Sequence, residues 1–103
     1  MFAMNTAMIL KALSNQKRLD LLEWLKSPEL HFPKEKCAGL DKQEVCVGLI
    51  EQKLGLSQST ASKYLAQLQH AGLVSARREG QWTYYRYNRD TAQAFMQALQ
   101  QKI

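Results

Sequence analysis

Short hydrogen-bonding side chains stand on one face of a helix that is predicted to begin near Ser57. At about 100° per residue, Ser59, Ser62 and Lys63 lie opposite the apolar positions of this segment, and Gln58 stands in its first turn. Gln, Ser and Lys side chains bind base edges or phosphates, and short side chains let a helix approach a groove closely. The pattern favours insertion into the major groove of DNA over a merely solvated face, for which stronger helix formers are typical.

A second group of basic and aromatic residues follows in a predicted β-hairpin. Strand-like runs at 74–78 and 82–87 are separated by EGQ, with a glycine in the turn. The candidates for contacts with a nucleic-acid backbone or minor groove are Arg77, Arg78, Gln81 and Arg86. The aromatic residues are expected mainly to pack. Binding of single-stranded RNA on a flat aromatic sheet is the alternative, but that mode usually uses four strands and two are visible.

The positive charge of the chain is concentrated around these two elements. The 103 residues carry a net charge of +5, and between positions 53 and 89 six Lys and Arg residues are opposed by Glu79 alone. Such a local excess indicates a polyanionic partner, most simply nucleic acid, with a solvated basic face as the alternative. The length and the 46% hydrophobic content fit one domain spanning 1–103.

A short turn connects the predicted groove-binding helix to the helix before it. Val47, Ile50 and Leu54 form the apolar stripe of that preceding helix, and Gly55 is suited to end it in a left-handed conformation. Ser57 is expected to cap the next helix by accepting a hydrogen bond from the backbone N–H of the second or third residue after it. Two helices joined by a three-residue turn that contains glycine are typical of a helix-turn-helix.

Two helices and a long connection precede this motif. An apolar helix over 5–13 has little polar surface, which indicates burial between subunits. Asn15 is expected to cap a second helix, with Leu19 and Leu25 among its core-facing positions. Residues 27–45 contain both prolines among many charges and are expected to be mostly irregular.

The remaining elements complete the predicted fold. A short strand is expected near Val45, and Asn88 or Asp90 is expected to cap a last helix that packs on the first. The expected fold class is therefore mainly α with a small β-hairpin (α+β). It is a winged helix-turn-helix with about five helices and a two- or three-stranded wing.

The chain offers little for catalysis or membrane insertion. No acidic pair lies in an apolar context, and no phosphate-binding glycine loop or nucleophile motif is present, so neither an enzyme nor a cofactor is expected. No run reaches the roughly 18 apolar residues that span a membrane. The first charge, Lys11, follows the apolar start, the reverse of a signal peptide, so a cytoplasmic location is expected.

Four segments together resemble the arsenic-repressor (ArsR/SmtB) family of winged helix-turn-helix regulators. They are ALSNQKRL at 12–19, GLSQSTASKYL at 55–65, LQHAGLV at 68–74 and REGQWTYYR at 78–86. The resemblance implies a homodimer, paired through its first and last helices, that binds an imperfect palindrome in double-stranded DNA. It also implies repression of transcription until an inducer lowers the affinity for DNA. The residues predicted to bind DNA are Ser57, Gln58, Ser59, Thr60, Ser62, Lys63, Arg77, Arg78, Gln81 and Arg86.

The chain departs from the metal-sensing pattern of that family. Metal-sensing members often carry Cys-x-Cys at the start of the third helix, whereas this chain has CVG at 46–48, so the second thiolate is missing. Another metal site of the family uses Asp and His ligands on the last helix, where Asp90 remains but no histidine follows His70. No bound metal is therefore expected.

Cys37 and Cys46 leave three interpretations open. They lie nine residues apart and would form a redox-sensitive disulfide if a flexible segment brings them together. With His31 they would supply three ligands for zinc. In the third interpretation Cys46 is simply buried and Cys37 is incidental.

The main alternative to a regulator is a winged-helix protein-interaction module that has lost specific DNA binding. The apolar segment at 5–13 and the long connection at 27–45 would then be partner surfaces. Titration against DNA duplexes at several salt concentrations separates the two hypotheses.

Overall fold

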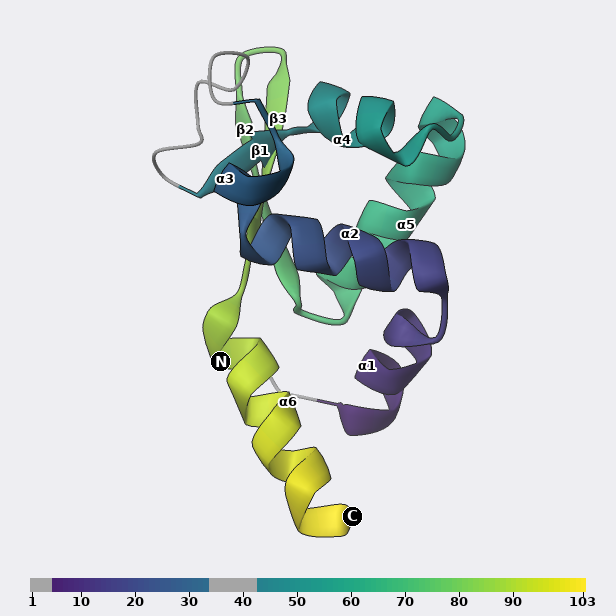
Figure 1. Cartoon of the computed structure of the whole chain (residues 1–103), viewed down its shortest axis with the longest axis vertical. Coiled ribbons are helices and arrows are strands. Elements are labelled where there is room, and N and C mark those ends of the chain that lie inside the picture. Colours follow the sequence, from purple (N-terminus) through teal and green to yellow (C-terminus); the bar gives the residue numbers. More distant parts are fainter. Residues whose placement is uncertain (1–4, 34–42) are drawn as a thin grey trace.

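The computed structural model describes residues 5–33 and 43–103, which form six helices and a three-stranded antiparallel sheet (Figure 1). In chain order the elements are α1 (Thr6–Leu13), α2 (Gln16–Lys26), α3 (Pro28–His31), β1 (Glu44–Cys46), α4 (Val47–Leu54), α5 (Gln58–His70), β2 (Val74–Glu79), β3 (Trp82–Tyr87) and α6 (Arg89–Lys102). This is the predicted winged helix-turn-helix, in which α4 and α5 form the helix-turn-helix and the sheet forms the wing. The expected count of about five helices missed α3, a single turn in the connection that was expected to be irregular.

Side-chain caps explain where three of the helices begin. Asn5, Asn15 and Ser57 stand at N-cap positions, and their side-chain oxygens accept hydrogen bonds from the backbone N–H three residues on, at 3.0, 3.1 and 3.2 Å. Helix α4 ends at Gly55, whose φ of 67° lies in the left-handed region that favours glycine. The predictions for Asn15, Gly55 and Ser57 are therefore confirmed, and the turn between α4 and α5 has the predicted length.

Strand β3 is the centre of the sheet, with β1 on one side and β2 on the other. The strand expected near Val45 is β1, where Val45 pairs with Tyr85 of β3 and makes the wing three-stranded. Glu79 pairs with Trp82, so the hairpin turn has two residues rather than the predicted three. Gly80 in this turn has φ of 61°, the positive value that such a tight turn requires.

The hydrophobic core lies between the sheet and the helices α2, α4 and α5 (Figure 1). In α2 the buried positions are Leu21 and Leu25. Leu19 is 42% exposed, so the prediction that it faces the core is wrong. Ile50 of α4 and Leu65 of α5 are fully buried in the same cluster, which fixes the rotation of α5 about its own axis.

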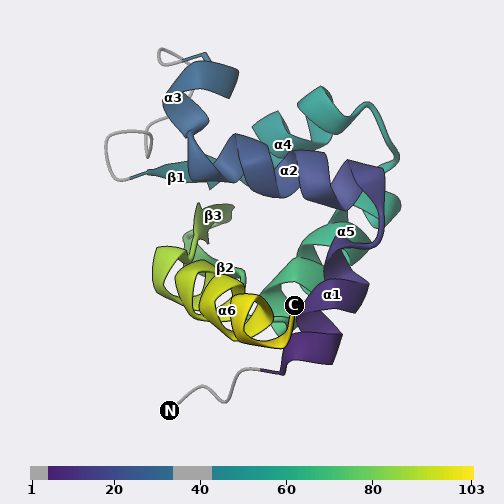
Figure 2. The same cartoon turned by 60° about the horizontal axis from the view of Figure 1, so that its bottom comes forward.

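Helices α1 and α6 pack against each other beside this core (Figure 2). Helix α1 buries Ile9 and Ala12, and α6 buries Ala92 and Phe95, while the C-terminal end of α6 extends away from the rest of the chain (Figure 1). The expected contact between the last and first helices is therefore present within one chain. Among the described residues, no helix has the length and apolar content needed to span a bilayer.

Candidate nucleic-acid interface

The outer side of α5 presents four of the predicted DNA-binding residues to solvent. Gln58, Ser59, Ser62 and Lys63, which we call the reading set, are all exposed, whereas Leu65 on the opposite side is fully buried. Among the described residues, the side chains of Gln58, Ser62 and Lys63 form no hydrogen bond or ion pair. Their hydrogen-bonding groups are thus available for another molecule.

Ser57 and Thr60 are joined to each other at the start of α5. The Ser57 hydroxyl donates to Thr60 Oγ1 at 2.9 Å and accepts from the Thr60 backbone N–H at 3.2 Å. Ser59 Oγ lies 3.3 Å from the same Ser57 hydroxyl. These contacts hold the first turn of α5 in place, and a helix N-terminus attracts phosphate through its free N–H groups and partial positive charge.

Arg78 and Gln81 lie at the tip of the wing. Both residues are exposed, and Arg78 Nε donates a hydrogen bond of 3.3 Å to the carbonyl oxygen of Gly80 in the turn. The remaining guanidinium nitrogens of Arg78 have no ion-pair partner within the described part of the chain. The tip therefore presents a cation and an amide to solvent.

Arg77 has a different environment, because it reaches across the sheet. Its Nε and Nη2 atoms each lie 2.9 Å from a carboxylate oxygen of Glu44, and its guanidinium carbon lies 5.0 Å from the centroid of the Tyr84 ring. Glu79 adds a longer contact of 3.4 Å. Arg77 belongs to β2, Tyr84 to β3 and Glu44 to β1, so the arginine links both edge strands across the central one.

Glu44 is a residue of this region that the sequence did not single out. Its side chain is 10% exposed, and its two-point hydrogen bonding is the main reason that the pKa of Arg77 is raised above its ordinary value. We call Arg77, Glu44 and Tyr84 the sheet clamp. A lone carboxylate at the start of a short strand carries no sequence signal for a partner 33 positions away.

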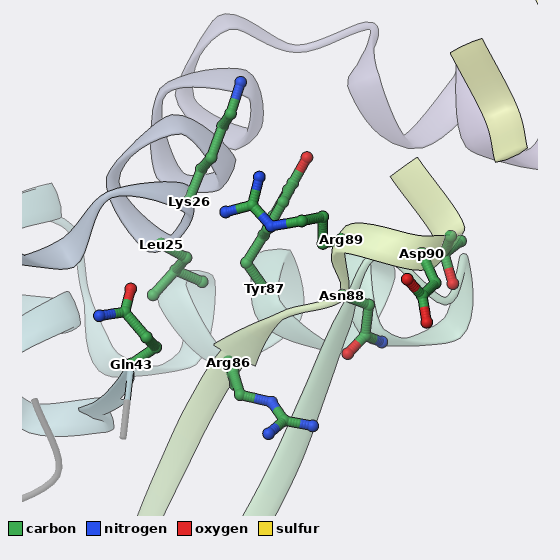
Figure 3. A pocket seen from close by; sticks show the side chains of 9 residues that line it. Leu25, Lys26, Gln43, Arg86, Tyr87, Asn88, Arg89 and Asp90 are labelled. Atoms are coloured by element: carbon green, nitrogen blue, oxygen red, sulfur yellow. The ribbon is translucent and has the colours of Figure 1, made fainter. Parts of the chain in front are cut away.

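Arg86 lies at the base of the wing rather than at its tip. At about 3.3 Å per residue, five positions along β3 separate it from Gln81 by roughly 16 Å. It borders a pocket of about 470 Å³ that is also lined by Lys26 and Arg89 (Figure 3). Figure 3 shows the Arg86 side chain directed away from those of Lys26 and Arg89. The predicted DNA-binding residues thus fall into four places: the start of α5, the wing tip, the sheet face where Arg77 binds Glu44, and the wing base.

Asn88 connects the end of the wing to the turn that follows α5. It stands at the N-cap position of α6, but its side chain makes no cap hydrogen bond there. Its amide nitrogen donates to the carbonyl oxygen of Gly72 at 2.9 Å, and its amide oxygen accepts from the Ser75 hydroxyl at 2.7 Å. The prediction that Asn88 or Asp90 caps the last helix is confirmed for the position, since Asn88 is the N-cap residue, but two partners outside α6 engage its side chain.

The proposed sensing residues are only partly within the described chain. Cys46 is half-buried and has a free thiol at the N-cap position of α4. Cys37 lies outside the described residues, so both the redox pair and the zinc alternative with His31 stay predictions. Within residues 5–33 and 43–103, no three His, Cys, Asp or Glu side chains come together in a metal-binding arrangement.

Comparison with known proteins identifies the family to which this chain belongs. The model described as "Bacterial regulatory protein, arsR family" matches residues 40–76. The HTH-type transcriptional regulator YbzH of Bacillus subtilis is 47% identical over 78 residues, which cover 76% of this chain and 78% of YbzH. The biofilm growth-associated repressor of Agrobacterium fabrum is 33% identical over 97 residues, covering 94% of this chain and 70% of that repressor.

A solved structure shares both the fold and the sequence pattern. The homodimeric winged helix-turn-helix DNA-binding domain Mb0332 of Mycobacterium bovis, described as a possible ArsR-family transcriptional regulator, has a TM-score of 0.64 and 34% identity. The match covers 90% of this chain and 73% of that chain. This chain therefore belongs to the ArsR family of winged helix-turn-helix DNA-binding transcriptional regulators, and it is not an enzyme.

Proposed function

We propose that this regulator is a homodimeric repressor that binds an imperfect palindromic operator and is released by an inducing signal. The observation that carries the proposal is the reading set, whose side chains are exposed on a helix that the core holds at one fixed rotation. The similarity to an Agrobacterium protein named as a repressor supports the direction of regulation. The similarity to the homodimeric Mb0332 domain supports the assembly.

In this proposal α5 reads bases and the wing binds the DNA backbone. The Gln58 side chain matches the hydrogen-bonding edge of adenine, and Lys63 favours guanine or phosphate. The hydroxyls of Ser59 and Ser62 can hydrogen-bond to several different bases. Arg78 and Gln81 at the wing tip are assigned to phosphates or the minor groove. We assign no base to Ser57 and Thr60, whose hydroxyls bond to each other at the helix start and are suited to a phosphate.

The homodimer is assigned to the surface formed by α1 and α6. Large apolar side chains on or directly after these helices remain exposed in the single chain: Leu10 of α1 at 46%, Met96 of α6 at 66% and Ile103, which follows α6, at 93%. Exposed apolar side chains grouped on two packed helices are typical of an interface between subunits. Two-fold pairing there would place the two α5 helices about one turn of DNA apart.

A binding titration combined with a reporter tests this function. A duplex selected by the protein from a random-sequence library is expected to be palindromic and bound far above non-specific background at physiological salt. Transcription from a promoter carrying that duplex should fall when the protein is expressed. Increased transcription would instead identify an activator, and failure to select any duplex would favour the protein-interaction module.

A hydrodynamic measurement tests the assembly. Met96→Glu places a charge in the proposed interface and is expected to shift the mass measured by sedimentation from dimer to monomer. Gln101→Glu adds the same charge at an exposed position about 140° around α6 from Met96 and serves as the control. A wild-type protein that sediments as a monomer at micromolar concentration would contradict the homodimer.

A further inference from the structure

One arginine of α2, outside the predicted DNA-binding set, contacts two other helices. Arg18, in the first turn of α2, donates from Nε to the carbonyl oxygen of Ala12 at 2.6 Å and from Nη2 to that of Lys11 at 3.3 Å. Its Nη1 donates to the side-chain oxygen of Gln67 in α5 at 2.9 Å. The guanidinium carbon also lies 5.4 Å from the centroid of the Tyr64 ring of α5. The side chain of one residue of α2 therefore connects the end of α1 to the recognition helix.

The chemistry of these contacts suits arginine and no other side chain. The carbonyl groups at the C-terminus of α1 carry partial negative charge, so a cation stabilises them, and the Lys11 carbonyl also accepts hydrogen bonds from the backbone N–H and the hydroxyl of Ser14. The planar guanidinium provides donors in several fixed directions, which lets it serve two carbonyls and one amide while stacking on an aromatic ring. Lysine provides the charge but lacks the fixed fork.

The position of Gln67 gives these contacts a functional meaning. Gln67 lies four residues after Lys63, so the two side chains are neighbours along α5, with Lys63 in the reading set. Helix α1 belongs to the proposed dimer surface. Arg18 thus hydrogen-bonds both to the helix that would pair the subunits and to the helix that would read DNA, at a place where these two helices also pack directly on each other.

We propose that Arg18 is a positioning residue that fixes α5 relative to the dimer surface and so sets the half-site spacing that the dimer accepts. The inference rests on the proposed function, because spacing has meaning only for a dimer on a palindrome. One base pair changes the rotation between half-sites by about 35°, since B-DNA turns once in about 10–10.5 base pairs. A rigid link between α1 and α5 makes the dimer intolerant of such a change, and a loose link makes it tolerant.

The test measures affinity for operators of altered spacing. The probes are the duplex selected by wild-type protein and derivatives in which the half-sites are moved together or apart by one base pair. Wild-type protein is expected to bind these derivatives about tenfold more weakly than the parent duplex, the cost of losing roughly one good base-pair contact. Gln67→Ala removes the hydrogen-bond acceptor on α5 while leaving both carbonyl contacts to α1 and the contact with the Tyr64 ring, and it should reduce this penalty to about threefold or less.

Three further variants separate positioning from stability. Arg18→Lys keeps the charge without the fork and should lose spacing discrimination as Gln67→Ala does. Gln67→Glu keeps an acceptor for the guanidinium and should retain spacing discrimination. Gln69→Ala, at an exposed glutamine of the same helix, is the matched control and should behave as wild type. Melting temperature and dimer mass are measured in parallel, because a purely structural role would change these without changing the spacing preference.

The outcomes distinguish this inference from the function on which it rests. Full spacing discrimination in both Gln67→Ala and Arg18→Lys would overturn the positioning role and leave the dimeric repressor intact. Absence of any preferred spacing in wild-type protein would overturn both. Selective loss of discrimination in the two variants, with retention in Gln67→Glu, is the expected result.

Discussion

The start of α5 and the wing carry similar chemistry but differ in how much of it is already used inside the protein. On α5, three of the four side chains in the reading set form no hydrogen bond or ion pair with another described residue. On the wing, Arg77 is bound to Glu44 and stacked on Tyr84, and Arg78 contacts the backbone of its own turn. Free polar groups suit base recognition, whereas the sheet clamp suits the shaping of a basic surface that follows the DNA backbone.

This difference teaches that positive charge alone does not identify a DNA contact. Arg77 and Arg78 are neighbours in sequence, yet they point to opposite faces of the sheet because side chains alternate along a strand. One is committed to a carboxylate on another strand, and the other has guanidinium nitrogens open to solvent. Substitutions in the two regions should therefore have separable effects, the largest of them at Gln58.

Replacing Gln58 should affect sequence preference more than any change in the wing. Gln58→Ala removes a two-point hydrogen-bonding group, and the expected loss of discrimination between the preferred base and its competitors is about 1–3 kcal/mol. Affinity for unrelated duplexes should change little. Selection from a random library by wild type and variant measures the effect, with Gln52→Ala on α4 as the control. An unchanged base preference would remove Gln58 from the reading set.

Replacing Arg78 should weaken binding to every duplex by a similar factor. If the guanidinium neutralises one phosphate, Arg78→Ala should reduce the slope of log affinity against log salt by about 0.9. Titrations of the selected duplex and a random duplex at four salt concentrations give both values. A variant that changed base preference while keeping the wild-type slope would contradict the division of labour between wing and α5.

The sheet clamp is expected to give a smaller effect of a different kind. Arg77→Ala should change the salt slope less than Arg78→Ala, because its charge is already balanced by Glu44. It should instead loosen the wing, seen as faster amide hydrogen exchange in β1 and β3.

Glu44→Gln provides the decisive comparison for the clamp. If Arg77 acts through the clamp, this variant should loosen the wing and weaken DNA binding, although it removes a negative charge. If Arg77 instead contacts phosphate and Glu44 competes for it, Glu44→Gln should strengthen binding. The sign of the affinity change therefore decides between the two roles.

Local chemistry explains which parts of the fold the sequence predicts. The caps at Asn15 and Ser57 and the turn at Gly55 depend on a few consecutive residues, so their signals survive in one sequence. The four-residue helix α3 is too short to show a periodic pattern. The choice of Leu21 over Leu19 as a core residue depends on where neighbouring elements lie, which periodicity alone does not reveal.

The candidate interface likewise contains features that the sequence predicts and long-range contacts that it does not. The exposed face of α5 follows from its apolar face, so the reading set is accessible to sequence reasoning. The side-chain pairs that join the wing strands and that join α2 to α5 are long-range: 33 positions separate Arg77 from Glu44, and 49 separate Arg18 from Gln67. Each pair has ordinary surface chemistry in the sequence and acquires its role only when the fold brings the two side chains together.

The smallest predicted effect concerns Tyr85, which packs against the core, and it is a change in the pH dependence of stability. The direction of that change follows from burial. Burial raises the pKa of the Tyr85 hydroxyl, because the charged form loses solvation among core residues. The folded state therefore favours neutral Tyr85, and this contribution to stability is present below pH about 10 and is lost as pH rises through the folded pKa. Tyr85→Phe should show a smaller loss of unfolding free energy than wild type between pH 8 and pH 10.5, measured by urea denaturation. Tyr84→Phe, on the clamp face of the same strand, is the matched control. If Tyr85→Phe loses as much unfolding free energy at alkaline pH as wild type, the burial of the Tyr85 hydroxyl does not cause that loss.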